Sequence, residues 1–159
     1  MYPTLIDPRH SFSELVAWAK FDRVYDLFYA EMFETQPPSP HVAIIELLQR
    51  DRPLRYATIA YDDMIALIGA NGYRPCTARE LIEFAVQHPH VQRDLTHLIA
   101  LGSVFAPREA DTAVLSMPRR DDWGGKMLEL LWRRKNGQDN VLFGDYTFPC
   151  VRRGSEIPL

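Results

Sequence analysis

The chain has few cysteines and no long apolar run. Its only cysteines, Cys76 and Cys150, are too few for a small protein held together by disulfides. No apolar run approaches the ~18 residues that a membrane-spanning helix needs. The opening residues include proline and aspartate and lack the apolar segment of a signal peptide. We therefore expect a cytoplasmic protein with no membrane partner.

Positive charge is also scarce. The 18 lysines and arginines are outnumbered by 21 aspartates and glutamates, so the net charge is −3. Because nucleic-acid-binding domains usually carry a strong basic excess, this balance argues against a nucleic-acid partner. Hydrophobic residues make up 47% and charged residues 25% of the chain, which is the composition of a globular domain. We expect one domain over residues 1–159 with a buried core.

Two capping boxes predict where helices begin. They lie at residues 11–14 (Ser-Phe-Ser-Glu) and 77–80 (Thr-Ala-Arg-Glu). In each, the hydroxyl can accept from the amide three residues later, and the glutamate can accept from the first amide in return. The first box predicts helical structure over residues 12–34, with a break near Lys20. The second begins a helix that carries His88 near its end, where a positive charge suits the helix dipole.

A further helix is predicted over residues 60–70. Ile65, Leu67 and Ile68 would face the core. The Asn-Gly pair that follows would end the helix, because either residue tolerates the left-handed conformation found at helix ends. Two adjacent aspartates in the first turn fit the positive end of the helix dipole, so they need no catalytic explanation.

The remaining apolar runs are short and separated by turns, which is the pattern of strands. Residues 42–48 fit a strand or a helix by periodicity, and the prolines and charges around them favour a strand. Further strands are expected over residues 98–105, with a kink at Gly102, and over residues 112–117, 127–132, 141–143 and 148–152. The sequence thus predicts an α+β fold. In it a helix-rich part (residues 1–100) packs on an irregular antiparallel β region (residues 101–153).

Two segments resemble parts of a known family. Gly72-Tyr-Arg-Pro-Cys-Thr-Ala-Arg-Glu-Leu-Ile-Glu-Phe-Ala85 is similar to a segment in which a short strand enters a capped helix. Phe148-Pro-Cys-Val-Arg-Arg153 is similar to a closing strand. Both resemble the formylglycine-generating-enzyme-like branch of the C-type lectin fold, which implies a C-type-lectin-like fold over residues 72–153. Residues 11–153 also resemble uncharacterised bacterial and phage hypothetical proteins, from which no function follows.

The resemblance leaves the chemistry open. The enzyme branch holds copper with a pair of cysteines near its C-terminal part, and neither Cys76 nor Cys150 stands where that pair would be expected. A divergent metal- and thiol-dependent enzyme that uses both cysteines is one alternative. Members of the fold without catalytic cysteines are often binding modules, and a free cysteine is commonly a small buried hydrophobe. We therefore expect no cofactor and favour a role that is not enzymatic.

No other motif indicates catalysis or metal binding. His88 and His90 form the only close pair of histidines, and no further ligands complete the four that a zinc site needs. Ser103 follows a glycine but lacks the G-x-S-x-G pattern of a nucleophile elbow. The sequence therefore predicts no catalytic residue and no metal ligand.

Arginines and tryptophans gather in the loop-rich C-terminal third. Both residue types are enriched where proteins bind partners, and loops on a rigid scaffold often carry function. Asp121 and Asp122 weaken the positive potential of the neighbouring arginines. The alternative to a binding site is therefore an ordinary solvent-exposed surface without a partner. We expect a non-catalytic binding module for a protein or glycan, anchored by Arg119, Arg120 and Trp123. The rim would be formed by Arg133, Arg134, Asn136, Asn140 and Tyr146.

A structural or assembly protein is the remaining alternative. Its mark would be a stable homo-oligomer that buries an apolar patch. The sequence does not predict the oligomeric state.

Overall fold

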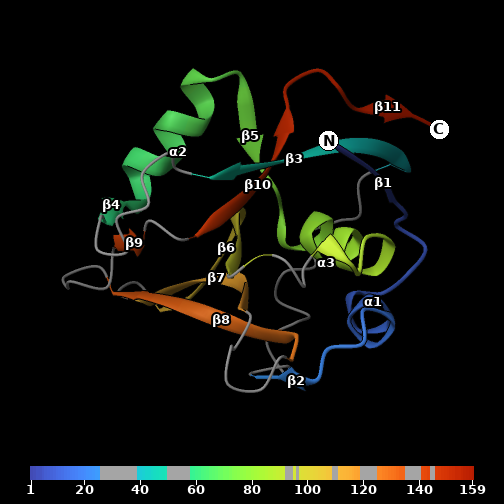
Figure 1. Ribbon diagram of the computed structural model, residues 1–159, viewed down its shortest axis with the longest axis horizontal. Coiled ribbons are helices and arrows are strands. Elements are labelled where there is room, and N and C mark those ends of the chain that lie inside the picture. Colours follow the sequence, from blue (N-terminus) through green and yellow to red (C-terminus); the bar gives the residue numbers. More distant parts are fainter. Residues whose placement is uncertain are drawn as a thin grey trace.

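The computed structural model describes residues 1–25, 39–49, 58–91, 95, 97–108, 111–118, 125–134, 141–143 and 146–159. Within these residues three helices and a large mixed sheet form an α+β fold (Figure 1), which confirms the predicted class. The helices are α1 (Phe12–Trp18), α2 (Tyr61–Ala70) and α3 (Ala78–Gln87).

The described strands form one nine-stranded sheet and one two-stranded sheet. The order in the larger sheet is β1-β3-β10-β6-β7-β8-β2, with β11 beside β3 and β5 beside β10, while β4 pairs with β9. Pairing is parallel where β10 meets β6 and where β2 meets β8. The sheet is therefore mixed. β6, β7 and β8 pair antiparallel, as predicted for the C-terminal region, whereas the parallel contact of β10 with β6 departs from that prediction. The strands are β1 (Tyr2–Ile6), β2 (Arg23–Val24), β3 (His41–Gln49), β4 (Thr58–Ala60), β5 (Tyr73–Pro75), β6 (His97–Arg108), β7 (Asp111–Pro118), β8 (Met127–Arg134), β9 (Val141–Phe143), β10 (Thr147–Arg152) and β11 (Ile157–Pro158).

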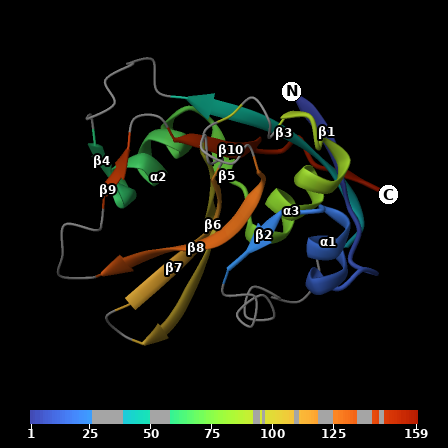
Figure 2. The ribbon, with the colours of Figure 1, turned by 60° about the horizontal axis from the view of Figure 1, so that its bottom comes forward.

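Helices cover both faces of the large sheet (Figures 1 and 2). Successive residues of a strand point to opposite faces, and the adjacent β6 residues Leu98 and Ile99 accordingly lie in two separate hydrophobic cores. Leu98 packs with residues of α1 and α3, whereas Ile99 packs with residues of α2. The two cores explain why the central strands are apolar on both faces.

Strands are not confined to the C-terminal part. β1, β3 and β5 come from the first half of the chain and lie in the same sheet as β6 and β10. β3 confirms the strand predicted over residues 42–48. The sequence does not predict β1, because the segment is only five residues long and contains Pro3, a residue that is unfavourable in most strands. The structure accommodates Pro3 at the edge of the sheet, where its missing N–H costs no ladder bond.

α1 is shorter than predicted. Its capping box is confirmed, since the Ser11 hydroxyl accepts from the Glu14 amide and the Glu14 carboxylate accepts in return. Lys20 then has φ of 52°, a left-handed conformation that stops the helix at the predicted break. The helix predicted to continue beyond Lys20 is not found up to residue 25. Residues 23–24 instead form β2, which pairs with β8. Residues 26–34 lie outside the described part of the chain.

α2 confirms the helix predicted over residues 60–70, but not its whole core face. Tyr61, Met64 and Ile68 are buried at positions i, i+3 and i+7. Leu67 lies off that face and is 45% exposed, so its predicted place in the core is wrong. Gly72 follows the helix with φ of 82° and confirms the predicted stop.

The kink predicted in β6 brings this strand against the start of α3. Pairing with β7 shifts register between Ala100 and Phe105. The Gly102 amide donates to the Cys76 carbonyl at 2.8 Å. The Ser103 hydroxyl accepts from the Ala78 amide at 2.9 Å, which satisfies one of the unpaired N–H groups in the first turn of α3.

Candidate functional site

A polar cluster lies at the start of β6, on the face of the sheet that α2 covers. We call it the His97 cluster, and it consists of His97, Ser116, Glu129 and Tyr146. The Nε2 atom of His97 lies 2.7 Å from the Ser116 hydroxyl and 3.9 Å from Oε1 of Glu129. The imidazole also packs on the Tyr146 ring, with 4.5 Å between ring centroids. One imidazole therefore joins residues from β6, β7, β8 and the approach to β10.

Strand register explains how these residues meet. Ser116 of β7 pairs with Ile99 of β6 on one side and with Glu129 of β8 on the other. Since paired residues share a face and every second residue returns to it, His97 lies on this same face. Apolar residues such as Val114 fill the middle of the face. The polar residues are thus collected at one end of it.

The cluster does not have the geometry of a hydrolase triad. In such a triad the carboxylate binds Nδ1 of the histidine while the serine binds Nε2. Here Ser116 and Glu129 both approach Nε2. The Ser116 residue is also fully buried, so its hydroxyl is not presented to a substrate. The side chains of His97 and Glu129 are 19% and 31% exposed, so solvent reaches both of them.

The predicted anchor follows this cluster directly in the sequence. Pro118, the last residue of β7, pairs with His97, and Arg119 is the next residue of the chain. Arg119, Arg120 and Trp123 themselves lie outside the described residues, as do Asn136 and Asn140.

The structure separates the described rim residues. Tyr146 is 8% exposed and packs on His97, so its ring belongs to the buried wall of the cluster rather than to an open rim. Arg133 and Arg134 pair with Thr112 and Asp111 at the far end of β8. About 17 Å of extended chain separates Arg134 from Glu129. These arginines do not share one end of the sheet with Tyr146.

Three members of the cluster were missed by sequence reasoning. His97, Ser116 and Glu129 are 13 or more residues apart in sequence and meet only through strand pairing. One signal was present: Ser116 interrupts the apolar run Ala-Val-Leu-Ser-Met of β7. A polar side chain inside a buried strand usually has a hydrogen-bond partner. Ser116 therefore indicates a polar partner elsewhere in the fold, although the sequence does not say which residue it is.

The two cysteines are buried in separate cores. Cys76 lies in the core with α1 and α3 and Cys150 in the core with α2, and both are free thiols with no exposed area. Burial raises the pKa of Cys150 to about 12 and raises the pKa of Cys76 well above its usual range. Both thiols are therefore neutral near pH 7, whereas nucleophilic attack and metal binding need the thiolate.

We expect neither cysteine of the folded protein to react with a thiol reagent such as DTNB near pH 7. Both should react once guanidinium unfolds the chain, because unfolding removes the burial that keeps them protonated. The measurement is the release of thionitrobenzoate before and after unfolding. Rapid labelling of the folded protein, or stoichiometric Cu(I) binding by it, would contradict the assignment of inert core thiols.

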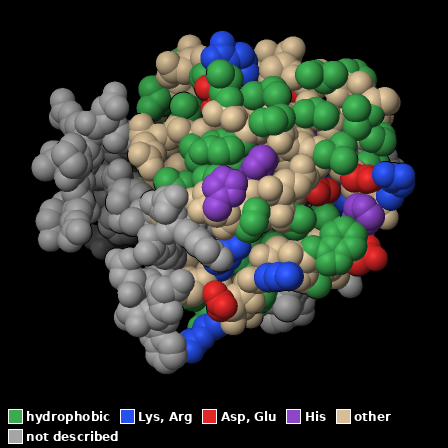
Figure 3. All heavy atoms as spheres, turned by 45° about the vertical axis from the view of Figure 1, so that its right-hand side comes forward, with side chains coloured by type: hydrophobic (Ala, Val, Ile, Leu, Met, Phe, Trp, Pro, Cys, Tyr) green, Lys and Arg blue, Asp and Glu red, His purple; other side chains and the backbone are tan. Residues whose placement is uncertain are grey.

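The predicted histidine pair lies at the end of α3. His88 is the C-terminal capping residue of this helix, and its amide donates to the Phe84 carbonyl at 2.8 Å. The predicted effect of a charge on its side chain stays a prediction. His90 lies beside it, with 6.4 Å between ring centroids. Figure 3 shows histidines lying among hydrophobic side chains on the side of the molecule that carries α1 and α3. Among the described residues, no group of three or more His, Cys, Asp or Glu side chains is placed to hold a metal.

The segments that resemble the lectin-fold branch have the expected local structure. β5 leads into the capped helix α3, and β10 pairs with β5, with Cys150 opposite Pro75. No family model, curated protein or solved structure matches the chain. No helix in the described ranges is both long enough and apolar enough to cross a membrane.

Proposed function

We propose that the protein is a non-catalytic binding module of the cytoplasm. Its contact surface would be formed by the exposed parts of the His97 cluster and by residues 119–124, which join β7 to β8. The observation that carries this proposal is the His97 cluster itself. It gathers an imidazole, a carboxylate and an aromatic ring at one end of the sheet, and Pro118, which pairs with His97, is followed in the sequence by Arg119.

Burial and charge favour binding over catalysis. The Ser116 hydroxyl and the thiols of Cys76 and Cys150 are buried, so none of these three groups is accessible as a nucleophile. A ligand would meet His97 and Glu129, whose side chains are 19% and 31% exposed. Hydrogen-bonding groups beside an aromatic ring suit a protein or a glycan. The net charge of −3 favours neither a nucleic acid nor another polyanion.

The C-type-lectin-like resemblance supports the same proposal. In that fold, members without catalytic cysteines are often binding modules, and their irregular C-terminal surface holds the ligand. The strand-to-capped-helix entry at β5 and α3, with β10 beside it, is compatible with this resemblance. The alternative of a divergent thiol enzyme gains no support from Cys76 and Cys150, because both are buried and neutral.

A photoreactive amino acid tests the surface. Placed at Trp123, it should form a specific adduct with a protein from source-cell lysate or with a glycan of a probe library. The matched control carries the same amino acid at Arg153, an exposed residue beyond the far end of β10. Once an adduct identifies the partner, replacing Arg119, Arg120 and Trp123 with alanine should weaken binding by at least about 30-fold, the loss expected for hot-spot residues.

Equal labelling from both positions would count against this surface, and so would full affinity of the triple alanine variant. Catalytic turnover that survives replacement of both cysteines would count against a purely binding role.

A further inference from the structure

β1 is an end strand of the large sheet among the described residues, so one of its edges has no strand partner. In a strand, the N–H and C=O groups of every second residue point to the same side. The unpaired edge of β1 presents groups of residues 3, 5 and 7. Four of them are the Pro3 carbonyl, the amide and carbonyl of Leu5, and the Asp7 amide. Exposed edges of this kind readily add a strand from another chain.

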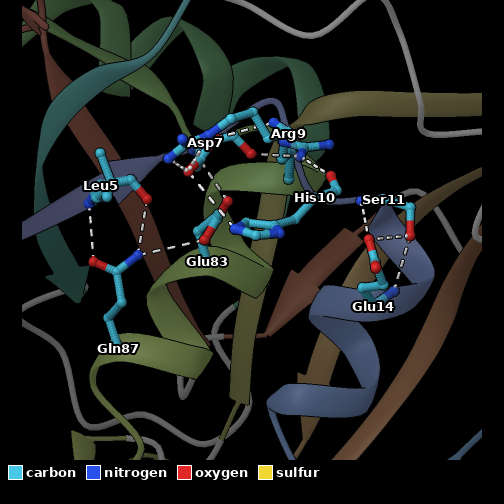
Figure 4. Close-up of polar contacts among 9 residues, drawn as sticks. Leu5, Asp7, Arg9, His10, Ser11, Glu14, Glu83 and Gln87 are labelled. Atoms are coloured by element: carbon cyan, nitrogen blue, oxygen red, sulfur yellow. Dashed lines mark hydrogen bonds and ion pairs between the residues drawn. The ribbon is translucent and has the colours of Figure 1, made fainter.

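Side chains of α3 and of its capping residue His88 occupy all four of these groups. The Gln87 side chain accepts from the Leu5 amide at 2.9 Å and donates to the Leu5 carbonyl at 2.8 Å (Figure 4). The Glu83 carboxyl accepts from the Asp7 amide at 3.2 Å. His88 Nε2 lies 3.0 Å from the Pro3 carbonyl and donates to it, since a carbonyl only accepts. We call these three side chains the α3 edge mask.

Helix and strand geometry explain the fit. Glu83 and Gln87 are four residues apart, and Arg79 extends the same stripe by another four residues. Four helical residues advance about 6 Å, and two strand residues advance about 6.8 Å. A stripe at i, i+4 and i+8 therefore follows every second residue of a neighbouring strand. Arg79 occupies the remaining outward carbonyl, that of Asp7, at 2.9 Å.

The mask is held firmly in place. α3 begins with a complete capping box at Thr77, and the rings of Tyr2 and Phe84 meet edge to face, with 5.4 Å between centroids. Glu83 is 4% exposed, and burial raises the pKa of its carboxyl. Such a carboxyl is positioned to accept from the Asp7 amide rather than to interact with water.

The masked edge is also complementary to itself. If β1 of a second copy lay antiparallel to it with Leu5 opposite Leu5, the two Leu5 residues would exchange two hydrogen bonds. Pro3 would then lie opposite Asp7, and each Asp7 amide would donate to a Pro3 carbonyl. The four groups that each copy needs for this pairing are the four that the α3 edge mask occupies. Proline has no N–H, so its place in this register leaves no donor without a partner.

We propose that Glu83, Gln87 and His88 mask a self-complementary edge, and that loss of the two Gln87 bonds at its centre, Leu5, is enough to let β1 of a second copy of this chain add to the sheet. The occupant is another copy because the outward groups match themselves about a two-fold axis at Leu5. Leu5 is 38% exposed, and its side chain would meet its counterpart across that axis.

The test compares Gln87→Met with Ala66→Met by sedimentation over a range of concentrations. The first substitution removes both hydrogen bonds to Leu5 while keeping the side-chain volume. The second places the same apolar side chain on an exposed position of α2, away from β1. We expect the wild type and Ala66→Met to keep one sedimentation coefficient, while the apparent mass of Gln87→Met rises toward twofold with concentration.

Hydrogen exchange at the Leu5 amide gives a second readout. In dilute Gln87→Met this amide should exchange about tenfold faster than in the wild type, the factor for one lost hydrogen bond. It should regain protection as the variant associates. Adding Leu5→Pro removes the outward N–H, not a bond to β3, and should return Gln87→Met to a monomer. A Gln87→Met protein that stays monomeric at every concentration would overturn the proposal, as would association that survives Leu5→Pro.

Discussion

Replacing Gly102 with alanine is expected to lower the free energy of unfolding by about 3 kcal/mol, toward the upper end of the cost of overfilling a tightly packed site. An added Cβ at this position would lie 2.6 Å from the Cys76 carbonyl oxygen and 2.7 Å from the Pro75 carbonyl oxygen. Both are backbone atoms, so no flexible side chain can move aside. β6 and the β5–α3 junction would have to separate.

The cost extends beyond one contact. Separation would weaken the bond from the Gly102 amide to the Cys76 carbonyl and the bond from the Ala78 amide to the Ser103 hydroxyl. Urea unfolding followed by circular dichroism measures the loss.

Gly69→Ala is the matched control for Gly102→Ala. Gly69 lies within α2, and the nearest atom to an added Cβ is a side-chain nitrogen of Arg153 at 3.6 Å, an ordinary contact. Alanine there should stabilise the protein by about 0.5–1 kcal/mol, because it favours the helix and restricts the unfolded chain. The same substitution is thus expected to have opposite signs at the two glycines. A loss at Gly102 no larger than about 0.5 kcal/mol would contradict the close approach.

The second large effect is expected at Glu80. Its carboxylate accepts from the Thr77 amide at 2.8 Å and from both terminal nitrogens of Arg74 at 2.6 and 2.8 Å. The Glu80 side chain is 4% exposed, so removing it leaves the Arg74 guanidinium in a partly buried place without its main partner. Glu80→Ala should lower the free energy of unfolding by about 3 kcal/mol.

Glu156 provides the comparison within the same cluster. It accepts from Arg74 at 2.6 Å as well, but its side chain is 39% exposed. An exposed ion pair contributes less than about 1 kcal/mol, because water and salt screen it. Glu156→Ala should therefore cost less than about 1 kcal/mol in the same unfolding measurement. Equal losses of unfolding free energy in Glu80→Ala and Glu156→Ala would contradict the prediction, because the burial and helix-capping bond of Glu80 would then add nothing to its contribution.

Local sequence patterns predicted where helices begin and end better than they predicted how helices and strands pack together. Both capping boxes and the stop after α2 depend on hydrogen bonds within a few residues, and the structure confirms them. The helix predicted after Lys20 failed where a distant strand, β8, competes for the same backbone groups. Leu67 failed because three neighbouring apolar residues of one helix cannot all face one sheet.

The candidate site lay largely beyond sequence reasoning. The sequence predicts Tyr146 on the rim of a binding surface, whereas the structure buries its ring against His97. That contact depends on how distant strands pair, which one sequence does not reveal. Ser116 and Glu129 meet because β7 pairs with β6 and with β8 at particular offsets. The role of Arg119, Arg120 and Trp123 stays a prediction.

Both ends of the chain converge on one strand. β1 and β11 both run antiparallel to β3, and Ile6 and Pro158 each pair with His41. Adjacent strands are about 4.8 Å apart, so only about 10 Å separates these two terminal segments across β3, as their nearness in Figure 1 illustrates. Tyr2 begins β1 beside Ile45, whereas Pro158 ends β11 beside His41, so β1 and β11 run parallel to each other. A linker from Pro158 to Tyr2 would therefore have to span about 17 Å, back along β3 and across it. A circularly permuted chain with such a linker would keep the strands in their present register.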